Sequence, residues 1–164
     1  MTPQSDPGLT HLNSAGEAHM VNVVDKQVTE RSATAYSFVS MSADVIALLR
    51  SGSMPKGDAL SVARIAAISA TKKTSELIPL CHPIAIHGVD VDLNIENSGV
   101  ALHVTVTTAD RTGVEMEALT GAAVGALALI DMVKGRDRNA RIDCVELLEK
   151  KGGRSGHWTR ESNA

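Results

Sequence analysis

One stretch of the sequence, from Arg111 to Gly135, constrains the fold more than any other part of the chain. It reads RTGVEMEALTGAAVGALALIDMVKG, and its charged side chains lie only near the two ends. Between Ala118 and Ile130 every side chain is apolar or small, so a helix here has no polar face and is expected to be buried on every side. The uncharged part is about a dozen residues, shorter than the ~20 that cross a bilayer, which predicts a core helix rather than a membrane span.

The charged residues at the two ends of this helix need partners, solvent or a function, because an unpaired charge in a low-dielectric site is costly. Glu115 and Glu117 lie at the start, and Asp131 and Lys134 lie at the end. At ~1.5 Å per residue, roughly 21 Å separates Glu117 from Asp131 in a continuous helix. If both ends serve one site, a second copy of the chain must supply one of them. This predicts a homo-oligomer with sites at a subunit interface.

Small residues within the same stretch agree with an oligomer. Gly121 and Gly125 have G-x-x-x-G spacing and clear one helix face for the close approach of another backbone. The simpler alternative is a plain core helix with a surface salt bridge between Asp131 and Lys134 at i,i+3.

Composition narrows the class of protein. With 164 residues the chain is one domain by size, and its net charge of −3 argues against a nucleic-acid partner. Tyr36, Phe38 and Trp158 are the three aromatic residues, so a heterocyclic ligand must be held by hydrogen bonds, charge and aliphatic walls. Cys81 and Cys144 form no zinc motif and no disulfide framework. The polar N-terminus resembles no signal peptide, which predicts a cytoplasmic protein.

The pattern along the chain predicts the order of elements. Residues 1–18 are rich in Pro, Ser, Gly and Asn and are expected to form an extended or mobile arm. A strand is predicted over Ala35–Met41, followed by a helix that Ser42 caps and that runs through Arg50. Asp58 is a good N-cap for a second helix to about Lys72, with Leu60, Ile65 and Ile68 among its apolar positions.

The second half gives the clearest alternation. Apolar residues alternate with polar ones over 89–96 and again over 102–106, with turn residues at 97–99, which predicts a β-hairpin. The buried helix follows, then a strand over 141–148 and a Gly-rich basic tail over 151–164. This order predicts an α+β domain over 19–150 with the ferredoxin-like split β-α-β-β-α-β plan, helices on one face of an antiparallel sheet, one extra helix and the N-terminal arm.

Several charged or reactive residues are candidates for chemistry. Lys134 beside Asp131 is the first candidate for acid-base work, provided that burial or a cation such as Lys56 lowers the pKa of the lysine. Lysine and glycine clusters suit a polyphosphate, although each cluster alone is also typical of a solvated surface. His82 stands beside Pro83 in a stiff segment and suits a ligand contact or a bond to a backbone carbonyl. Cys81 is better explained as a small buried thiol than as a nucleophile.

These motifs together resemble the cyclic pyranopterin monophosphate synthase family of molybdenum cofactor biosynthesis. The matching segments are HLNSAGEAHM at 11–20, KGD at 56–58, LIPLCHP at 77–83, TGVEMEALT at 112–120, Asp131-Met132 with Lys134, and the Gly-Gly-basic-Ser-Gly tail. They span nearly the whole chain. The resemblance implies conversion of a cyclised dihydroguanosine triphosphate into cyclic pyranopterin monophosphate and pyrophosphate. It also implies a ferredoxin-like subunit in a hexamer built as a trimer of dimers, with active sites between subunits.

The resemblance also implies the roles of individual residues. The catalytic candidates are Asp131, Lys134 and Lys56. The substrate-binding candidates are Leu80, Cys81, His82, Met116, Glu117, Glu115, Lys72, Arg31 and Lys150. No metal ligands and no tightly bound cofactor are expected, although Mg²⁺ can accompany the triphosphate. A non-catalytic ligand-binding module of the same fold is the main alternative, and an RNA-binding sheet is a weaker one because the predicted hairpin has no aromatic residue.

Overall fold

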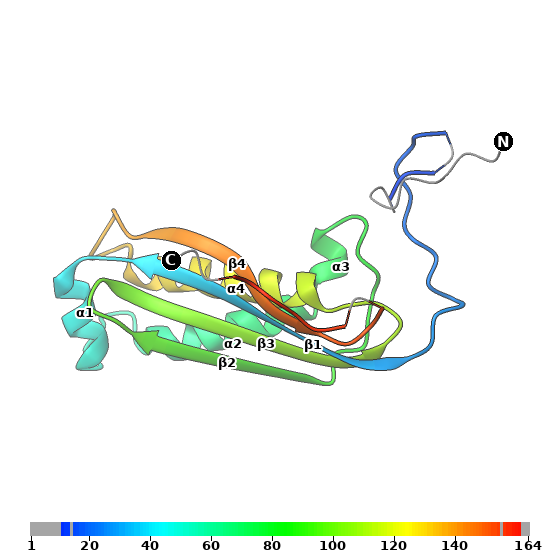
Figure 1. Ribbon diagram of the computed structural model, residues 1–164. Helices are drawn as coiled ribbons and strands as arrows, with labels where there is room; N and C mark the ends of the chain where they lie inside the picture. Colours follow the sequence, from blue (N-terminus) through cyan, green and yellow to red (C-terminus); the bar gives the residue numbers. More distant parts are fainter. Residues whose placement is uncertain (1–10, 14, 155, 162–164) are drawn as a thin grey trace.

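The computed structural model describes residues 11–13, 15–154 and 156–161, and Figure 1 shows how the elements are arranged. Part of the predicted arm and a few residues of the predicted tail therefore lie outside the described residues. The elements, in chain order, are β1 (Thr29–Ser40), α1 (Ala43–Arg50), α2 (Ala59–Thr71), α3 (Thr74–Leu77), β2 (Gly88–Ile95), β3 (Gly99–Asp110), α4 (Glu115–Val133), β4 (Arg141–Lys151) and β5 (Trp158–Thr159).

The five strands form one antiparallel sheet in the order β2-β3-β1-β4-β5. The long helices α2 and α4 lie on one face of it (Figure 1), and the first four strands follow the split β-α-β-β-α-β plan. The predicted α+β, ferredoxin-like class is confirmed. α1 is the predicted extra helix. The short elements α3 and β5 were not predicted, since four and two residues give no detectable period.

β1 and β4 are longer than the alternation suggested. β1 begins at Thr29 rather than Ala35, because its first half pairs with the end of β3, from Thr29 opposite Asp110 onwards. β4 continues past Leu148 to Lys151, which lies opposite Ser32. The predicted hairpin of β2 and β3 is confirmed, and its turn is closed by the Glu96 N–H donating to the Gly99 carbonyl at 2.8 Å.

The two helix starts are stabilised in different ways. The Asp58 carboxylate accepts a hydrogen bond from the Ser61 N–H at 3.0 Å, as predicted for the cap of α2. Ser42 occupies the N-cap position of α1, but its hydroxyl makes no capping hydrogen bond. Instead the Asp137 carboxylate accepts from the Ser42 N–H at 2.7 Å, so the loop after α4 anchors the start of α1.

The core lies between α4, α2 and the sheet, and small side chains bring these layers together. The face that α2 buries is its alanine stripe, which includes Ala63 and Ala67. Ile65, predicted as an apolar position of this helix, is 64% exposed. A Cβ on Gly121 would lie 2.8 Å from the Thr71 Cγ2, and one on Gly125 would lie 3.1 Å from the Ala67 Cβ. The two glycines therefore admit α2 of the same chain, which corrects the interpretation that they receive another subunit.

The prediction that α4 is buried on every side was wrong for the single chain. Its sheet-facing and α2-facing residues are buried, including Ala118, Ala122 and Leu129 at 0% exposure. Leu127 is 56% exposed, however, and Met116 is 37% exposed. By length and composition alone α4 resembles a membrane-spanning helix, but so do core helices of soluble proteins, and most of its apolar window is buried within the chain.

Candidate functional site

The candidate residues fall into two groups at opposite ends of α4. The carboxyl-terminal group contains Lys56, from the loop before α2, with Asp131 and Lys134. The amino-terminal group surrounds Glu115 and Glu117. Because α4 has 19 residues, roughly 28 Å long at 1.5 Å per residue, the two groups cannot meet within one chain.

At the carboxyl-terminal end, two lysines share one carboxylate. The Lys134 Nζ lies 2.6 Å from the Asp131 Oδ1, and the Lys56 Nζ lies 3.3 Å from its Oδ2. The Lys56 Nζ also donates to the Asp131 backbone carbonyl at 2.9 Å. The loop that carries Lys56 is thereby held against the last turn of α4. The structure brings all three catalytic candidates together.

This cluster is solvated in the single chain. The side chains of Lys56, Asp131 and Lys134 are 49%, 57% and 59% exposed. Hydrogen bonds from Lys134 and then Lys56, with the charge of both lysines, hold the pKa of Asp131 below its usual value. Asp131 is therefore an ionised acceptor that fixes two ammonium groups side by side, an arrangement suited to relaying protons or to binding an anion.

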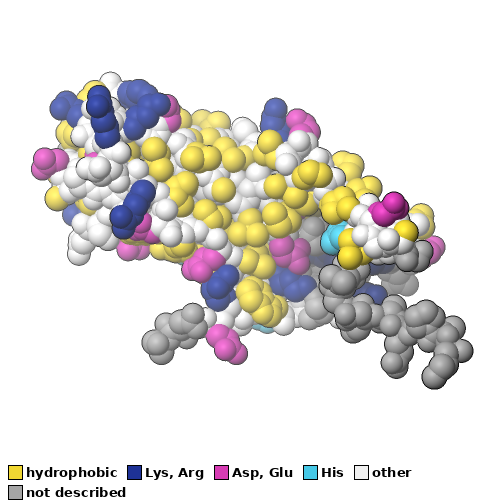
Figure 2. Space-filling model, turned by 90° about the horizontal axis from the view of Figure 1, so that it is seen from above, with side chains coloured by type: hydrophobic (Ala, Val, Ile, Leu, Met, Phe, Trp, Pro, Cys, Tyr) yellow, Lys and Arg dark blue, Asp and Glu magenta, His cyan; other side chains and the backbone are white. Residues whose placement is uncertain are grey.

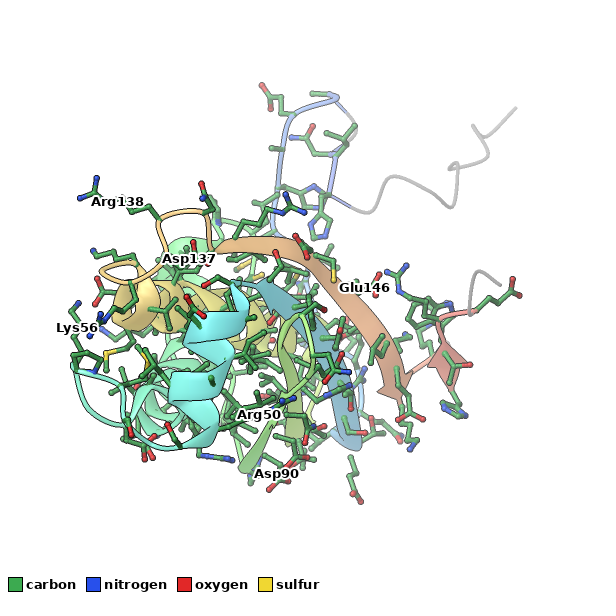
Figure 3. All side chains as sticks on the ribbon, turned by 90° about the vertical axis from the view of Figure 1, so that its left-hand side faces the viewer. Arg50, Lys56, Asp90, Asp137, Arg138 and Glu146 are labelled. Carbon is green, nitrogen blue, oxygen red and sulfur yellow. The ribbon has the colours of Figure 1, made fainter. Side chains whose placement is uncertain are left out.

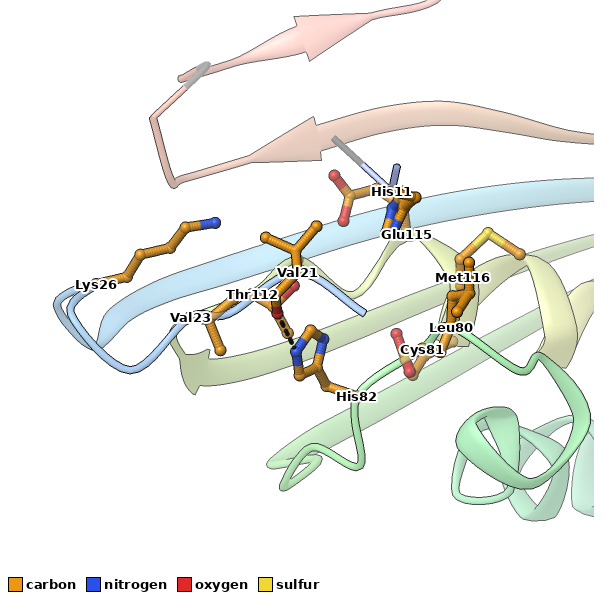
Figure 4. A pocket seen from close by; sticks show the side chains of 12 residues that line it. His11, Val21, Val23, Lys26, Leu80, Cys81, His82, Thr112, Glu115 and Met116 are labelled. Carbon is orange, nitrogen blue, oxygen red and sulfur yellow. Dashed lines mark hydrogen bonds between the residues drawn. The ribbon is translucent and has the colours of Figure 1, made fainter. Parts of the chain in front are cut away.

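At the amino-terminal end the chain forms a cavity of about 370 Å³, seen from close by in Figure 4. Three segments surround it: the chain before β1, the stiff segment after α3, and the start of α4. The lining residues are His11, Val21, Val23, Lys26, Leu80, Cys81, His82, Thr112, Gly113, Glu115, Met116 and Glu117. Six of the predicted substrate-binding residues, Leu80 to His82 and Glu115 to Glu117, therefore share one cavity.

His82 joins two walls of this cavity. Its Nε2 lies 2.8 Å from the carbonyl oxygen of Val21 and donates to it, as the dashed line in Figure 4 marks. The bond to a backbone carbonyl, one of the two interpretations of this histidine, is present, and the ring still lines the cavity. Burial and the nearby Glu117 raise the pKa of the Cys81 thiol, which makes it a neutral wall of the cavity rather than a nucleophile.

Glu117 is the buried carboxyl of the site, at 4% exposure. Burial, together with the charge of Glu115, raises its pKa to about 7. Glu115 is half-buried and forms an ion pair with Lys150, with 3.6 Å between the Lys150 Nζ and the Glu115 Oε1. Near neutral pH the buried carboxyl of Glu117 therefore readily holds a proton.

The remaining predicted contacts lie beside the cavity rather than in its wall. Lys72 lines a separate cavity of about 70 Å³ that shares His82 and Glu117 with the larger one. The Arg31 guanidinium donates to the carbonyls of Asp110 and Arg111, at 2.9 Å and 3.3 Å. A Cβ on Gly153 would collide with that guanidinium, so the glycine of the tail lets the chain pass over Arg31.

The sequence match extends over the parts of the chain that carry both groups. A family model described as the MoaC family matches residues 20–153. The chain belongs to the MoaC family. It is 51% identical over 152 residues to "Cyclic pyranopterin monophosphate synthase 2" of Mycobacterium tuberculosis (strain ATCC 25618 / H37Rv), covering 93% of this chain and 91% of that protein.

Two further relatives carry nearly the same name, cyclic pyranopterin monophosphate synthase. The protein from Streptomyces avermitilis is 51% identical over 158 residues, covering 96% of this chain and 93% of the relative. The protein from Nocardioides sp. is 52% identical over 155 residues, covering 93% and 95%. The match of this MoaC-family chain therefore includes both ends of α4.

Sequence reasoning missed part of the cavity of this MoaC-family chain. Lys26 lines it but stood alone in the sequence, with no motif to mark it. It is placed there by a tertiary contact, because the Arg111 Nε donates to the Lys26 carbonyl at 2.9 Å. Val21, Val23 and Thr112 also line the wall. The HLNSAGEAHM and TGVEMEALT motifs were the available signals for the segments around them.

A protein-only metal site was not predicted for this chain. Within the part of the chain that the structure describes, no group of three or more His, Cys, Asp or Glu side chains is placed to hold a metal ion. The cations that face the candidate groups are lysines and arginines, which bind phosphate oxygens directly.

Proposed function

We propose that this chain is a cyclic pyranopterin monophosphate synthase of molybdenum cofactor biosynthesis. In this proposal it converts (8S)-3',8-cyclo-7,8-dihydroguanosine 5'-triphosphate into cyclic pyranopterin monophosphate and pyrophosphate, as a phosphorus-oxygen lyase. The observation that carries the proposal is the Lys56–Asp131–Lys134 cluster in a chain that is about half identical to proteins of that name.

The cluster supports a role in acid-base chemistry. Rearrangement of the rings requires proton transfers, and formation of the cyclic phosphate requires a sugar hydroxyl to lose its proton as pyrophosphate leaves. Asp131 holds the Lys134 and Lys56 ammonium groups close together, so two groups that can donate protons lie side by side. Their positive charge offsets the negative charge that develops on the phosphate.

The cavity supports recognition of the guanine-derived part of the substrate. Its carboxyls, Glu115 and Glu117, suit ring N–H and amino donors, because a carboxylate accepts two such bonds side by side. The walls from Leu80, Cys81 and Met116 provide apolar contact without aromatic stacking. Arg31, Lys72 and Lys150, which lie around the cavity, are proposed to hold anionic parts of the substrate. Mg²⁺, where it takes part, is proposed to be carried by the triphosphate itself.

One site needs both groups, so we propose that the active unit is an oligomer in which the cavity of one chain faces the lysine cluster of another. A hexamer, as a trimer of dimers, is the proposed assembly. An apolar band supports it: Met116, Leu127 and Val145 of α4 and β4 are 37%, 56% and 38% exposed. Figure 2 views the side on which β4 and α4 lie and shows a broad apolar area. Patches of this kind mark contact surfaces.

The open face of the sheet bears on the alternative of an RNA-binding sheet. Tyr36 and Phe38 lie on the central strand β1 and are only partly buried, so this face does carry aromatic side chains. Exposed Asp90 and Asp92 lie on the neighbouring part of the sheet, on β2. Carboxylates repel a phosphate backbone, so this face favours the small-molecule proposal.

The direct test is to supply the purified protein with the cyclised dihydroguanosine triphosphate and to measure pyrophosphate release. We expect Lys134→Ala to lower kcat by about 10³-fold, within the range for loss of a general acid or base, while substrate affinity changes by only a few fold. Arg50→Ala is the control, because it also removes an exposed cation. The Arg50 guanidinium is bonded to the β2–β3 turn and not to the cluster.

Two results would contradict the proposal. No turnover by the wild-type protein would reject the reaction, and unchanged turnover in Lys134→Ala would reject the role of that lysine. Retained binding with no wild-type turnover would instead favour a non-catalytic ligand-binding module.

A further inference from the structure

The loop after α4 carries a cluster of cations that the proposed reaction has not used. Residues 131–141 read DMVKGRDRNAR and contain four cations and two carboxylates. Figure 2 shows Lys and Arg side chains gathered at the end of the molecule where α1 and this loop lie. With four cations and two carboxylates, residues 131–141 carry a formal charge of +2, although the chain as a whole carries a net charge of −3.

The two carboxylates of residues 131–141 are already engaged. Asp131 is paired with Lys56 and Lys134. Asp137 accepts from the N–H groups of Ser42 and Asn139, at 2.7 Å and 2.8 Å, and these bonds lower its pKa. Among the described residues, neither carboxylate forms an ion pair with the arginines on either side of Asp137.

Arg136 and Arg138 are the cations left over. Both are exposed, and within the described part of the chain neither guanidinium has a hydrogen bond or an ion pair. Arg141 differs, since its Nε lies 2.6 Å from the Asp143 Oδ1. Figure 3 shows Arg138 extending away from the body of the molecule, while Asp137 lies against it and Lys56 lies at the same end.

Hydrogen bonds hold the backbone of this loop in place, so the Cα positions of the two arginines are fixed. The N–H groups of Arg136 and Asp137 donate to the Val133 carbonyl at 2.8 Å and 3.0 Å, which continues the last turn of α4. Asp137 then ties the loop to the start of α1. Arg136 stands two positions after Lys134, so the arginine and the lysine cluster lie at the same end of α4.

We propose that Arg136 and Arg138 capture the polyphosphate of the substrate and guide it to the Lys56–Asp131–Lys134 cluster. The inference rests on the proposed function. Guanidinium groups without partners bind phosphate oxygens in pairs. Uncompensated cations at a site entrance also raise the rate at which a polyanion is captured, and salt screens this effect. The arginines act on capture and not on the chemical step.

The kinetic test compares the wild type with Arg136→Gln/Arg138→Gln at low and high salt. We expect kcat/KM to fall about tenfold at low salt, the lower end for electrostatic steering, with kcat unchanged. At 1 M salt, where the Debye length is about 3 Å, the difference should disappear. Arg136→Lys/Arg138→Lys should recover most of the loss.

Arg50→Gln is the matched control. It removes one positive charge, against two in the double variant, and the length of α1, about 12 Å over its 8 residues, separates it from the loop. We expect less than a twofold change in kcat/KM. An equal effect of this control would show that net charge, and not the two arginines, is responsible.

A binding measurement keeps the inference separate from the proposed reaction. Inorganic tripolyphosphate, titrated by calorimetry at low salt, should bind the double Gln variant several-fold more weakly than the wild type. Equal affinity would overturn the inference, whether or not the wild type turns over the proposed substrate. A fall in kcat at constant KM would also overturn it.

The two arginines could instead serve only the structure, since cations near a helix carboxyl terminus stabilise its dipole. In that case the Gln variant would lose unfolding free energy while tripolyphosphate affinity and the salt dependence of kcat/KM stayed the same, and the inference would be rejected. Pyrophosphate added as an inhibitor distinguishes the two anions. A higher inhibition constant in the Gln variant assigns the arginines to the leaving group as well as to the substrate.

Discussion

The two ends of α4 hold carboxyl groups in opposite environments. Glu117, at the amino-terminal end, is 4% exposed, and burial raises its pKa to about 7. Asp131, at the carboxyl-terminal end, has a side chain that is 57% exposed, and two lysines lower its pKa. One end is a recess that removes groups from water, and the other is a solvated cluster of charge. In the proposed function, binding and proton chemistry are therefore separated along one helix, and an assembly has to bring them together.

The largest expected effect comes from mixing two inactive variants, one changed at each end. His82→Ala removes a wall of the cavity, and Lys134→Ala removes an ammonium from the cluster. In a two-fold dimer with random pairing, about a quarter of the sites in an equal mixture combine two intact halves. We therefore expect pyrophosphate release to rise from near zero for either variant to about a quarter of the wild-type rate.

The control for this experiment is a doubly changed chain, His82→Ala/Lys134→Ala, mixed with either single variant. It should give no recovery, because no pair of chains then contains both intact halves. Mass spectrometry of the mixture confirms that subunits exchange. If they exchange and the two single variants still show no recovery, each site lies within one subunit and the proposed shared site is rejected.

The next largest effect is on the middle of α4, which keeps the two ends at a fixed separation. Gly121→Val places two methyl groups against Thr71 and Val104, where a Cβ alone would already lie 2.8 Å and 3.0 Å away. Overpacking of this kind should lower the free energy of unfolding by about 3 kcal/mol. The measurement is urea unfolding followed by circular dichroism.

Gly135→Val is the matched control for that change, since nothing lies within 4 Å of a Cβ at Gly135 and its φ is not positive. Its free energy of unfolding should stay within about 0.5 kcal/mol of the wild type, as at most surface sites. Equal losses of unfolding free energy in both variants would mean that close packing of α2 against Gly121 does not itself stabilise the fold.

The sequence was sufficient for most of the fold because its periodic patterns were long. The alternation of Val89, Val91 and Leu93 predicted β2, and the run from Ala118 to Ile130 predicted α4. The partner of the Gly121 and Gly125 face could not be predicted, because a cleared helix face does not specify which backbone approaches it. The alanine residues of α2 were the available signal for this contact. Larger apolar residues such as Ile65 were instead expected to form the buried face of that helix.

The sequence predicted the site residues that lie in recognisable motifs. It missed residues that only tertiary contacts bring to the cavity. LIPLCHP and TGVEMEALT contributed six cavity residues, but no motif marks Lys26, whose carbonyl accepts a hydrogen bond from the distant Arg111. The opposite pKa shifts of Glu117 and Asp131 were also beyond the sequence. Both residues are acidic and flank the same apolar run, and only burial in three dimensions separates them.

A smaller effect distinguishes the two ends by pH. In the unfolded chain Glu117 ionises near pH 4.5, whereas its pKa in the folded chain is about 7. Below pH 4.5 both states hold the proton, and between these values the folded state holds more protons, so stability falls as pH rises. In Glu117→Gln this loss is absent. The variant should therefore gain on the order of 2 kcal/mol relative to the wild type between pH 4.5 and 7, measured by urea unfolding at each pH.

A constant difference between Glu117→Gln and the wild type across this range would mean that the pKa of Glu117 is ordinary. Glu115→Gln serves as the comparison at the same end. It breaks the ion pair with Lys150 but leaves the buried carboxyl in place, so the fall in stability between pH 4.5 and 7 should remain.

The smallest effect on stability is expected at the other end of the helix. Asp131→Asn breaks two ion pairs, but these are exposed and screened by solvent, so the unfolding midpoint at pH 7 should hardly move. The folded pKa of Asp131 is lowered, so its contribution to stability is present above the unfolded pKa and is lost as pH falls through the folded one. Any difference from the wild type should therefore begin to shrink below about pH 4 and vanish once Asp131 is protonated in the folded chain too, the reverse of the window for Glu117. Pyrophosphate release by the same variant should fall by at least about a hundredfold, because Lys134 then loses its ion pair and Lys56 keeps only its bond to the backbone carbonyl of residue 131. A large loss of stability with little loss of turnover would instead make Asp131 a structural residue. The proposal that one end of α4 binds substrate and the other transfers protons would then be rejected.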